Sequence, residues 1–304
     1  MTTFNPEKVL LQNAKTGEIP SEIGTLVLKE VANNSLVAKL GTYEPMDKME
    51  KKFTYLAEGP GAYWVEEAEK IQVDKATWLQ ATMKAHKLGV IVPVSKEYLK
   101  FTVSDFFNAI KPHIEEALRN KMDQAVFFGS DDSPFGTGAS IVEKANTAGN
   151  KLEKTADLYG DLNKLMALVE ASDNDPKAFV TTKALNVDLR GALDKNGRPI
   201  FTEATQGAAA TALGLPVLYG NKNVWDKKKA EIITGDFTKL RYGMPAGIEY
   251  SISEDATLST VVDEEQKPIH LFERDMVALR VTAYFGFMTL KDDAFAVITP
   301  KAGA

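Results

Sequence analysis

The sequence contains no cysteine and has only three histidines, His86, His113 and His270, among its 304 residues. The lack of cysteine excludes disulfides, thiolate zinc sites, iron–sulfur clusters and cysteine nucleophiles. The histidines are far apart in the sequence and share no metal-ligand spacing, so a surface role explains them better than catalysis or metal binding. The sequence therefore predicts no metal site and no cofactor.

Arginine is also scarce: the chain has six, and the first hundred residues have none. Lysine and arginine together number 36 against 42 aspartates and glutamates, which leaves a net charge of −6. Proteins that recognise a DNA sequence use arginine forks and a basic face. This composition argues against a sequence-specific DNA-binding protein, although a local lysine cluster is still able to contact a phosphate backbone.

Long hydrophobic runs are missing as well. No segment approaches the roughly 18 uninterrupted apolar residues of a membrane-spanning helix, and residues 1–6 have neither the basic start nor the apolar run of a signal peptide. We therefore expect no membrane association. The composition, 44% hydrophobic and 26% charged, is typical of a globular protein, and the length suggests two lobes.

Catalytic motifs are missing too. The segment Gly136-Thr137-Gly138 lacks the third glycine of a dinucleotide site, and neither a phosphate-binding loop nor a nucleophile elbow occurs. Carboxylate pairs such as Asp292/Asp293 lie in polar sequence, whereas acid–base catalysis needs one carboxyl in a buried environment. The sequence predicts no catalytic residue, and the protein is not expected to be an enzyme.

The most informative segment is a predicted β-ribbon. Residues 52–56 form a strand, residues 58–61 a turn, and residues 79–86 alternate apolar and polar side chains as a half-exposed strand does. Residues 88–94 are almost continuously apolar, which predicts a strand covered on both faces. The ribbon thus begins in solvent and ends in a core. A monomer has little use for such a projection, whereas an assembling subunit can lay it on a neighbour.

Aromatic and acidic side chains lie in or beside this ribbon. Trp64 and Trp78 suggest a stacking platform for nucleic acid, but with few arginines nearby, packing or a protein contact explains them better. The candidate subunit-contact residues are Tyr63, Trp64, Glu66, Glu67 and Trp78.

The rest of the chain alternates helix and strand. A long helix is predicted over residues 104–128, where Pro112 should bend or break it and Gly129 should end it. This pattern is typical of an α+β fold with two lobes and projecting extensions. The other predicted elements are an extended arm at 1–19, a helix from Ser21 to about Asn34, helices at 158–169 and 185–193, strands at 178–180, 215–218, 231–233 and 276–288, and a mobile loop at 205–213.

Several segments, in the same order along the chain, resemble HK97-type major capsid proteins of tailed phages. Gly61 to Glu67, followed by Ala76-Thr77-Trp78, is similar to the extended loop of that family, and Lys87 to Leu99 resembles its run into the long spine helix. The resemblance covers nearly the whole chain and is strongest to proteins of long-tailed phages and prophages of Gram-positive bacteria. The later matching segments are Leu193 to Arg198, Leu213 to Val217, Gly235 to Phe237 and Arg280 to Phe295.

The resemblance implies an HK97-like capsid fold of the α+β class. Its expected parts are an N-terminal arm and short helix (1–45), an extended β-loop (46–88), a peripheral domain with the spine helix (89–154), an axial domain (155–268) and a C-terminal strand that returns to the peripheral domain (269–304).

The resemblance also implies a function. The expected protein is a structural subunit of an icosahedral capsid around double-stranded DNA. It would occur in the virion and assemble in the bacterial host cytoplasm as homo-oligomeric hexamers and pentamers. Expected partners are a portal protein and, without sequence specificity, the packaged DNA. Because the chain lacks the long helical scaffolding segment of some relatives, a separate scaffolding protein or prior trimming is also expected.

Two other classes stay open at this point. An encapsulin-like nanocompartment would share the fold but enclose cargo in place of DNA. A cytosolic hydrolase of unknown type is the more distant alternative, because no motif supports it.

Overall fold

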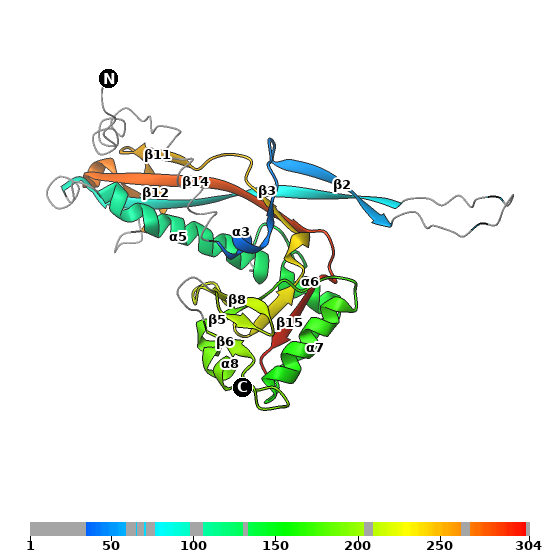
Figure 1. Cartoon of the computed structure of the whole chain (residues 1–304). Helices are drawn as coiled ribbons and strands as arrows, with labels where there is room; N and C mark the ends of the chain where they lie inside the picture. The colour runs from blue at the N-terminus through cyan, green and yellow to red at the C-terminus, as the bar shows by residue number, and fades with distance from the viewer. Residues whose placement is uncertain are drawn as a thin grey trace, which may run out of the picture.

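The computed structural model describes residues 35–58, 65, 70, 77–97, 106–129, 133–203, 209–262 and 268–301. The predicted arm at 1–19 and the helix predicted from Ser21 lie outside these residues. An elongated lobe and a compact lobe lie one above the other, and a two-stranded ribbon projects far beyond the elongated lobe (Figure 1). The predicted α+β class with two lobes is confirmed.

The elongated lobe is built on a six-stranded sheet with the order β1-β10-β14-β3-β2, in which β11 also pairs with β14. Strand β14 is its centre: it runs antiparallel to β3 from the pair Met276 and Ser95 to the pair Gly286 and Ala85. The long strand predicted at 276–288 is thereby confirmed. The strands are β1 Thr42–Tyr43, β2 Glu50–Glu58, β3 Thr77–Ser95, β10 Leu240–Gly243, β11 Glu249–Ser253 and β14 Met276–Thr289.

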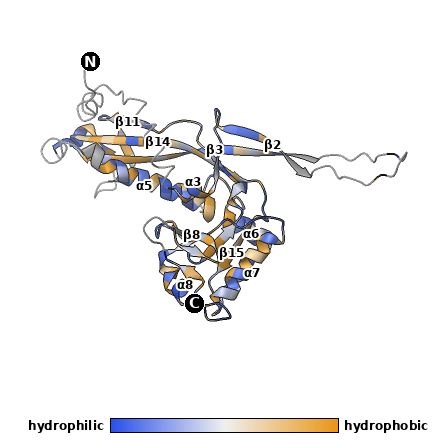
Figure 2. Cartoon of the chain, in the orientation of Figure 1, coloured by the Kyte–Doolittle hydropathy of each residue, from blue (hydrophilic) through white to orange (hydrophobic). Residues whose placement is uncertain are grey.

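One long helix, α5 (Phe106–Phe127), lies along this sheet (Figure 1). Ile114, Leu118, Met122 and Val126 recur every four residues and are all buried, so one stripe of the helix faces the strands. In Figure 2 the helix accordingly shows hydrophobic and hydrophilic colours side by side. The predicted helix is therefore confirmed.

The expected break at Pro112 does not occur, because α5 continues through this residue. Pro112 lies in the second turn, where its missing N–H removes a single bond near the helix end. Gly129, with a φ of +59°, ends the helix as predicted. The Nζ of Lys229 donates to the carbonyl oxygens of Phe128 and Gly129 at 3.2 and 3.3 Å, so a cation satisfies the last turn.

The compact lobe contains a seven-stranded sheet with the order β4-β15-β9-β5-β8-β7-β6. Alternate side chains of its central strands point to opposite faces. Phe179, Ala296 and Ile298 pack in the cluster that contains helix α7, whereas Val180 and Phe295 join the core of the elongated lobe. The two lobes therefore share a hydrophobic core. The elements are α6 Ile141–Thr147, β4 Lys151–Glu153, α7 Leu158–Glu170, β5 Ala178–Thr182, α8 Asn186–Gly191, β6 Phe201–Thr202, β7 Thr211–Ala212, β8 Leu215–Gly220, β9 Ile232–Gly235 and β15 Phe295–Thr299.

Short elements complete the chain. Helix α3 (Leu36–Leu40) lies beside α5, and the hairpin of β12 (Thr257–Val262) and β13 (Pro268–His270) precedes β14. Three single turns of 3₁₀ helix are η1 Lys183–Leu185, η2 Phe237–Lys239 and η3 Phe272–Arg274.

Three further sequence predictions need correction. The loop predicted at 205–213 contains strand β7, which pairs with both β6 and β8, while residues 204–208 lie outside the described part. The helix predicted at 185–193 ends at Gly191, and Leu193 forms an isolated β-bridge with Pro199.

The third correction concerns the apolar run at 88–94, which is covered on one face only. Leu88, Val90 and Val92 pack on the core, whereas Ile91 on the other face is 48% exposed. An apolar run predicts burial on both faces but does not say which molecule supplies the second layer.

Candidate assembly sites

The ribbon of β2 and β3 projects from the sheet of the elongated lobe (Figure 1). Strand β3 changes partners along its length: residues 85–95 pair with β14, whereas residues 77–84 pair with β2 alone. The paired part of the ribbon thus extends beyond the sheet (Figure 1). Since an isolated two-stranded hairpin is marginally stable in water, this length of ribbon gains stability from any surface that covers it.

A small apolar cluster fixes the root of the ribbon. Met46 and Met83 are buried against Ala85, with Phe53 and Met288 packed around them. The root also needs glycine: a Cβ on Gly286 would lie 2.8 Å from the carbonyl oxygen of Lys84. Beyond this cluster the polar side chains of Lys52, Thr54, Gln80 and Thr82 are exposed, and the described start of β2 is mostly hydrophilic in Figure 2.

Charged side chains brace the same root. Glu44 forms ion pairs with Arg241 at 2.8 Å and with Lys51 at 3.4 Å, and all three side chains are only partly exposed. The Nζ of Lys51 also donates to the carbonyl oxygen of Pro45 at 2.6 Å. Because these contacts join β2 to the segment before it and to β10, they fix the direction in which the ribbon leaves the sheet.

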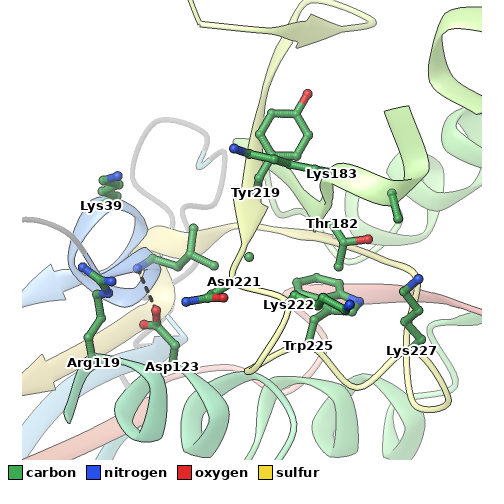
Figure 3. A pocket seen from close by; sticks show the side chains of 13 residues that line it. Lys39, Arg119, Asp123, Thr182, Lys183, Tyr219, Asn221, Lys222, Trp225 and Lys227 are labelled. Carbon is green, nitrogen blue, oxygen red and sulfur yellow. Dashed lines mark hydrogen bonds between the residues drawn. The ribbon is translucent and has the colours of Figure 1, made fainter. Parts of the chain in front are cut away.

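A second anchored element is helix α3, where the described chain begins. Its N-cap, Ser35, accepts a hydrogen bond from the N–H of Val37 and donates one to Asp123 on α5. Asp123 also accepts from the backbone N–H groups of Leu36 and Val37, each at 3.2 Å; Figure 3 shows this carboxylate at the start of α3. One buried carboxylate therefore holds the first turn of α3 on the long helix.

This carboxylate titrates unusually. Burial raises the pKa of Asp123 above its ordinary value, although its hydrogen bonds and the charge of Arg119 act in the opposite direction. A carboxyl whose folded pKa is raised binds more protons in the folded than in the unfolded state. The contribution of Asp123 to the free energy of unfolding therefore increases as the pH falls through its folded pKa. This stabilisation is fully present below the unfolded pKa.

We accordingly expect the stability difference between the wild type and Asp123→Asn to be pH-dependent. As the pH falls from 7 to about 4, the free energy of unfolding of the wild type should rise relative to that of the variant, because the asparagine does not titrate. Urea unfolding of the unassembled subunit at a series of pH values measures this difference. Asp175→Asn, which removes an exposed carboxylate, is the matched control. A difference that stays constant or shrinks on acidification would contradict the prediction.

Most of the predicted contact residues lie outside the described part of the chain. Tyr63, Trp64, Glu66 and Glu67 belong to this group. Trp78 is placed on β3, paired with Leu56 of β2 toward the far end of the ribbon. Their role in subunit contact stays a prediction.

The structure adds two exposed apolar side chains that the sequence did not single out. Phe272, in η3, is 76% exposed and Val187, on α8, is 71% exposed. They lie in different lobes, and no periodic pattern marks either of them as exposed.

The described residues offer little to chemistry. Among them, no group of three or more histidine, aspartate or glutamate side chains is arranged to hold a metal ion. His86 packs edge-on against Phe135 at 4.8 Å, and the Nδ1 of His270 is hydrogen-bonded to the hydroxyl of Thr257 at 2.8 Å. Within the same residues, no helix is both long and apolar enough to span a bilayer.

Comparisons with known proteins give a consistent result. The sequence profile described as the phage capsid family matches residues 17–299. The major capsid protein of Staphylococcus phage 80alpha is 42% identical over 298 residues, which cover 98% of this chain and 89% of that protein. A probable major capsid protein, gp17 of Mycobacterium phage D29, is 26% identical over 89% of this chain and 86% of its own length.

Solved structures agree with the sequence relatives. A chain from Microbacterium phage Oxtober96 has a TM-score of 0.75 and 26% identity, covering 88% of this chain and 91% of that chain. The capsid of an empty GTA particle has a TM-score of 0.65 at 14% identity, over 88% of this chain and 89% of that chain, which shows a shared fold.

Proposed function

This chain belongs to the phage capsid family, and from that premise we propose that it closes an icosahedral shell of hexamers and pentamers around double-stranded DNA. It is a structural subunit of a phage capsid, and its place is the capsid of the virion. The predicted HK97-like fold is confirmed by its structural neighbours.

The observation that carries the proposal is the ribbon of β2 and β3. It extends past the last strand that supports it, and its root is braced by Glu44 and by the cluster around Met83. The contacts at its root fix the direction of the ribbon, so its projecting part is oriented to contact a surface outside the subunit. We propose that this surface is a neighbouring copy of the same chain. The apolar face of β3 at Ile91, which the subunit leaves open, is a second surface for a neighbour to cover.

The domain division given above remains part of the proposal, with the arm and short helix at 1–45, the extended loop at 46–88 and the axial domain at 155–268. Within the last range, β10 and β11 pair with β14 and belong to the sheet of the elongated lobe. We also propose that the subunit assembles in the bacterial host cytoplasm with a separate scaffolding protein and a portal protein. The net charge of −6 supports a wall that DNA touches without adhering strongly, because like charges repel.

We further propose that the subunit performs no catalysis. Its relatives are capsid proteins, and the described histidines are engaged in packing and local hydrogen bonds or lie alone on α5. The work of such a chain is geometric, and many modest contacts between copies supply the energy of assembly.

Light scattering on the purified chain, followed by electron microscopy, tests the proposal. We expect particles of megadalton mass, by themselves or with the scaffolding protein of the same phage. A stable 33.3 kDa monomer under both conditions would contradict it. Particles from a natural source should contain a genome; a cargo enzyme in place of DNA would support the encapsulin-like alternative.

Trp64 provides a sharper test at the ribbon. If it anchors the ribbon on a neighbour, Trp64→Ala should lower the melting temperature of particles far more than that of the free subunit. The control is Trp225→Ala, because Trp225 is 7% exposed and its Nε1 donates to the carbonyl oxygen of Ala230 within the subunit. That control should destabilise subunit and particle alike. Equal losses for Trp64→Ala would assign this residue to internal packing.

A further inference from the structure

A cleft of about 730 Å³ lies between the two lobes, and its wall is strongly basic. Helices α3 and α5 form one side, and the ends of β5 and β8 with the following loop form the other (Figure 3). Five cations line it: Lys39, Arg119, Lys183, Lys222 and Lys227. The four lysines are exposed and the arginine is half-buried.

The lining of the cleft contains one carboxylate, that of Asp123. Asp188 and Glu231, which line an adjoining pocket with Lys227, are paired with Lys154 at 2.7 and 2.8 Å. Asp123 is buried at the floor of the cleft, where its carboxylate accepts a hydrogen bond from the first turn of α3. Glu116 accepts a hydrogen bond from Asn221 at 3.0 Å. Asp226, in the same loop, accepts from the backbone N–H of Lys228. Across the described part of the chain, none of the four lysines has a carboxylate oxygen within 4.0 Å. The cleft therefore carries a local excess of positive charge on a subunit whose net charge is negative.

The scaffold beneath the lysines is rigid. Trp225 is buried with its ring edge-on to Phe128 at 4.9 Å, and Asn221 is hydrogen-bonded to Asn120 of α5 at 3.2 Å. These contacts attach the loop of Lys222 and Lys227 to the long helix. The positions of the charges are thus set by the fold, while the flexible lysine stems let each charge adapt to its ligand.

We propose that this cleft is where the shell subunit binds the phosphate groups of packaged DNA. Lysine ammonium groups act as point charges toward phosphates and need no fixed base sequence. Leu36 and Trp225 of the lining are buried, whereas the four lysines are exposed, so a ligand at the mouth meets positive charges that suit the repeated phosphates of a duplex. The duplex lies across the mouth of the cleft, with the lysines reaching its backbone. This inference rests on the proposed enclosure of DNA.

The test compares two variants of the chain, in each of which three lysines are replaced by uncharged glutamine. Lys183→Gln, Lys222→Gln and Lys227→Gln are combined in one chain, and the control combines Lys151→Gln, Lys195→Gln and Lys291→Gln, which removes three exposed lysines outside the cleft. Fluorescence anisotropy with a labelled duplex of about 30 base pairs measures affinity at several salt concentrations. We expect the cleft variant to lose affinity about tenfold or more at low salt. The slope of log affinity against log salt should fall by about 2.7, at about 0.9 per lost phosphate contact.

Other outcomes overturn the inference. Equal affinities of the cleft and control variants, or no measurable binding by the wild type, would show that the cleft does not bind DNA. An acidic peptide that binds the wild type more tightly than DNA, and not the cleft variant, would assign the cleft to a protein segment. Electron microscopy of each variant keeps the two proposals distinguishable, because shell formation tests the structural role and the affinities test the cleft.

Discussion

A subunit with a shortened ribbon should fold and yet form no shells. The change is the replacement of residues 57–77 by an Asn-Gly turn, which joins the paired residues Leu56 and Trp78 through a tight hairpin. The cluster of Met46, Met83 and Ala85 stays complete, so the free energy of unfolding should change by less than about 1 kcal/mol. Assembly should be lost, because the part of the ribbon that reaches a neighbour is gone.

Thermal unfolding of the free subunit and electron microscopy of assembly reactions measure the two effects separately. A variant that unfolds at the wild-type temperature but gives no particles is the expected result. Particles of normal size and yield would show that assembly does not need the ribbon, and would contradict the prediction. A variant that does not fold would show that the ribbon serves the subunit itself, which also contradicts the prediction.

Deletion of residues 1–19 is the second change expected to abolish shells. The deletion ends well before Ser35, and the hydrogen bonds from Ser35, Leu36 and Val37 to Asp123 are untouched. The subunit should therefore keep its stability to within about 1 kcal/mol. The resemblance to capsid proteins implies that the arm clasps an adjacent copy, so without it contacts between capsomers should fail.

The same pair of measurements applies to this deletion. Sedimentation of assembly reactions should show free subunits or small oligomers where the wild type gives shells. Full-size particles from the truncated chain would refute the role of the arm. The Asp123→Ala variant is informative beside it, since it releases the first turn of α3 while keeping every residue of the arm.

Much of the fold follows from local pattern. The period-two alternation at 79–86 and the helical spacing from Ile114 to Val126 each dictate one element, and the structure confirms both. The local break expected at Pro112 does not occur, because a proline in the second turn removes one backbone hydrogen bond and the helix continues beyond it. Ile91 was wrongly predicted to be buried, because an apolar run shows that a strand face is hydrophobic but does not show which molecule covers that face.

The contacts that define the functional surfaces are less accessible to sequence analysis. The sequence did contain a sign that Asp123 is buried, because this carboxylate lies between Met122 and Val126 on the apolar side of the long helix. Its partner, Ser35, lies 88 residues away, and no spacing rule connects the two. The basic cleft had no signal at all, because Lys39, Arg119 and Lys183 come together only when both lobes are formed.

Strand β14 supports β3, β10 and β11 at once, and β15 joins β4 to β9, although both come from the last residues of the chain. A nascent polypeptide therefore cannot complete the first sheet before residues 276–289 have been synthesised, nor the second before residues 295–299. Before that moment β3 lacks its long partner, and the ribbon has no firm base from which to extend. Chains that terminate before residue 276 should consequently be unable to enter a growing particle, because the topology leaves both of their sheets incomplete.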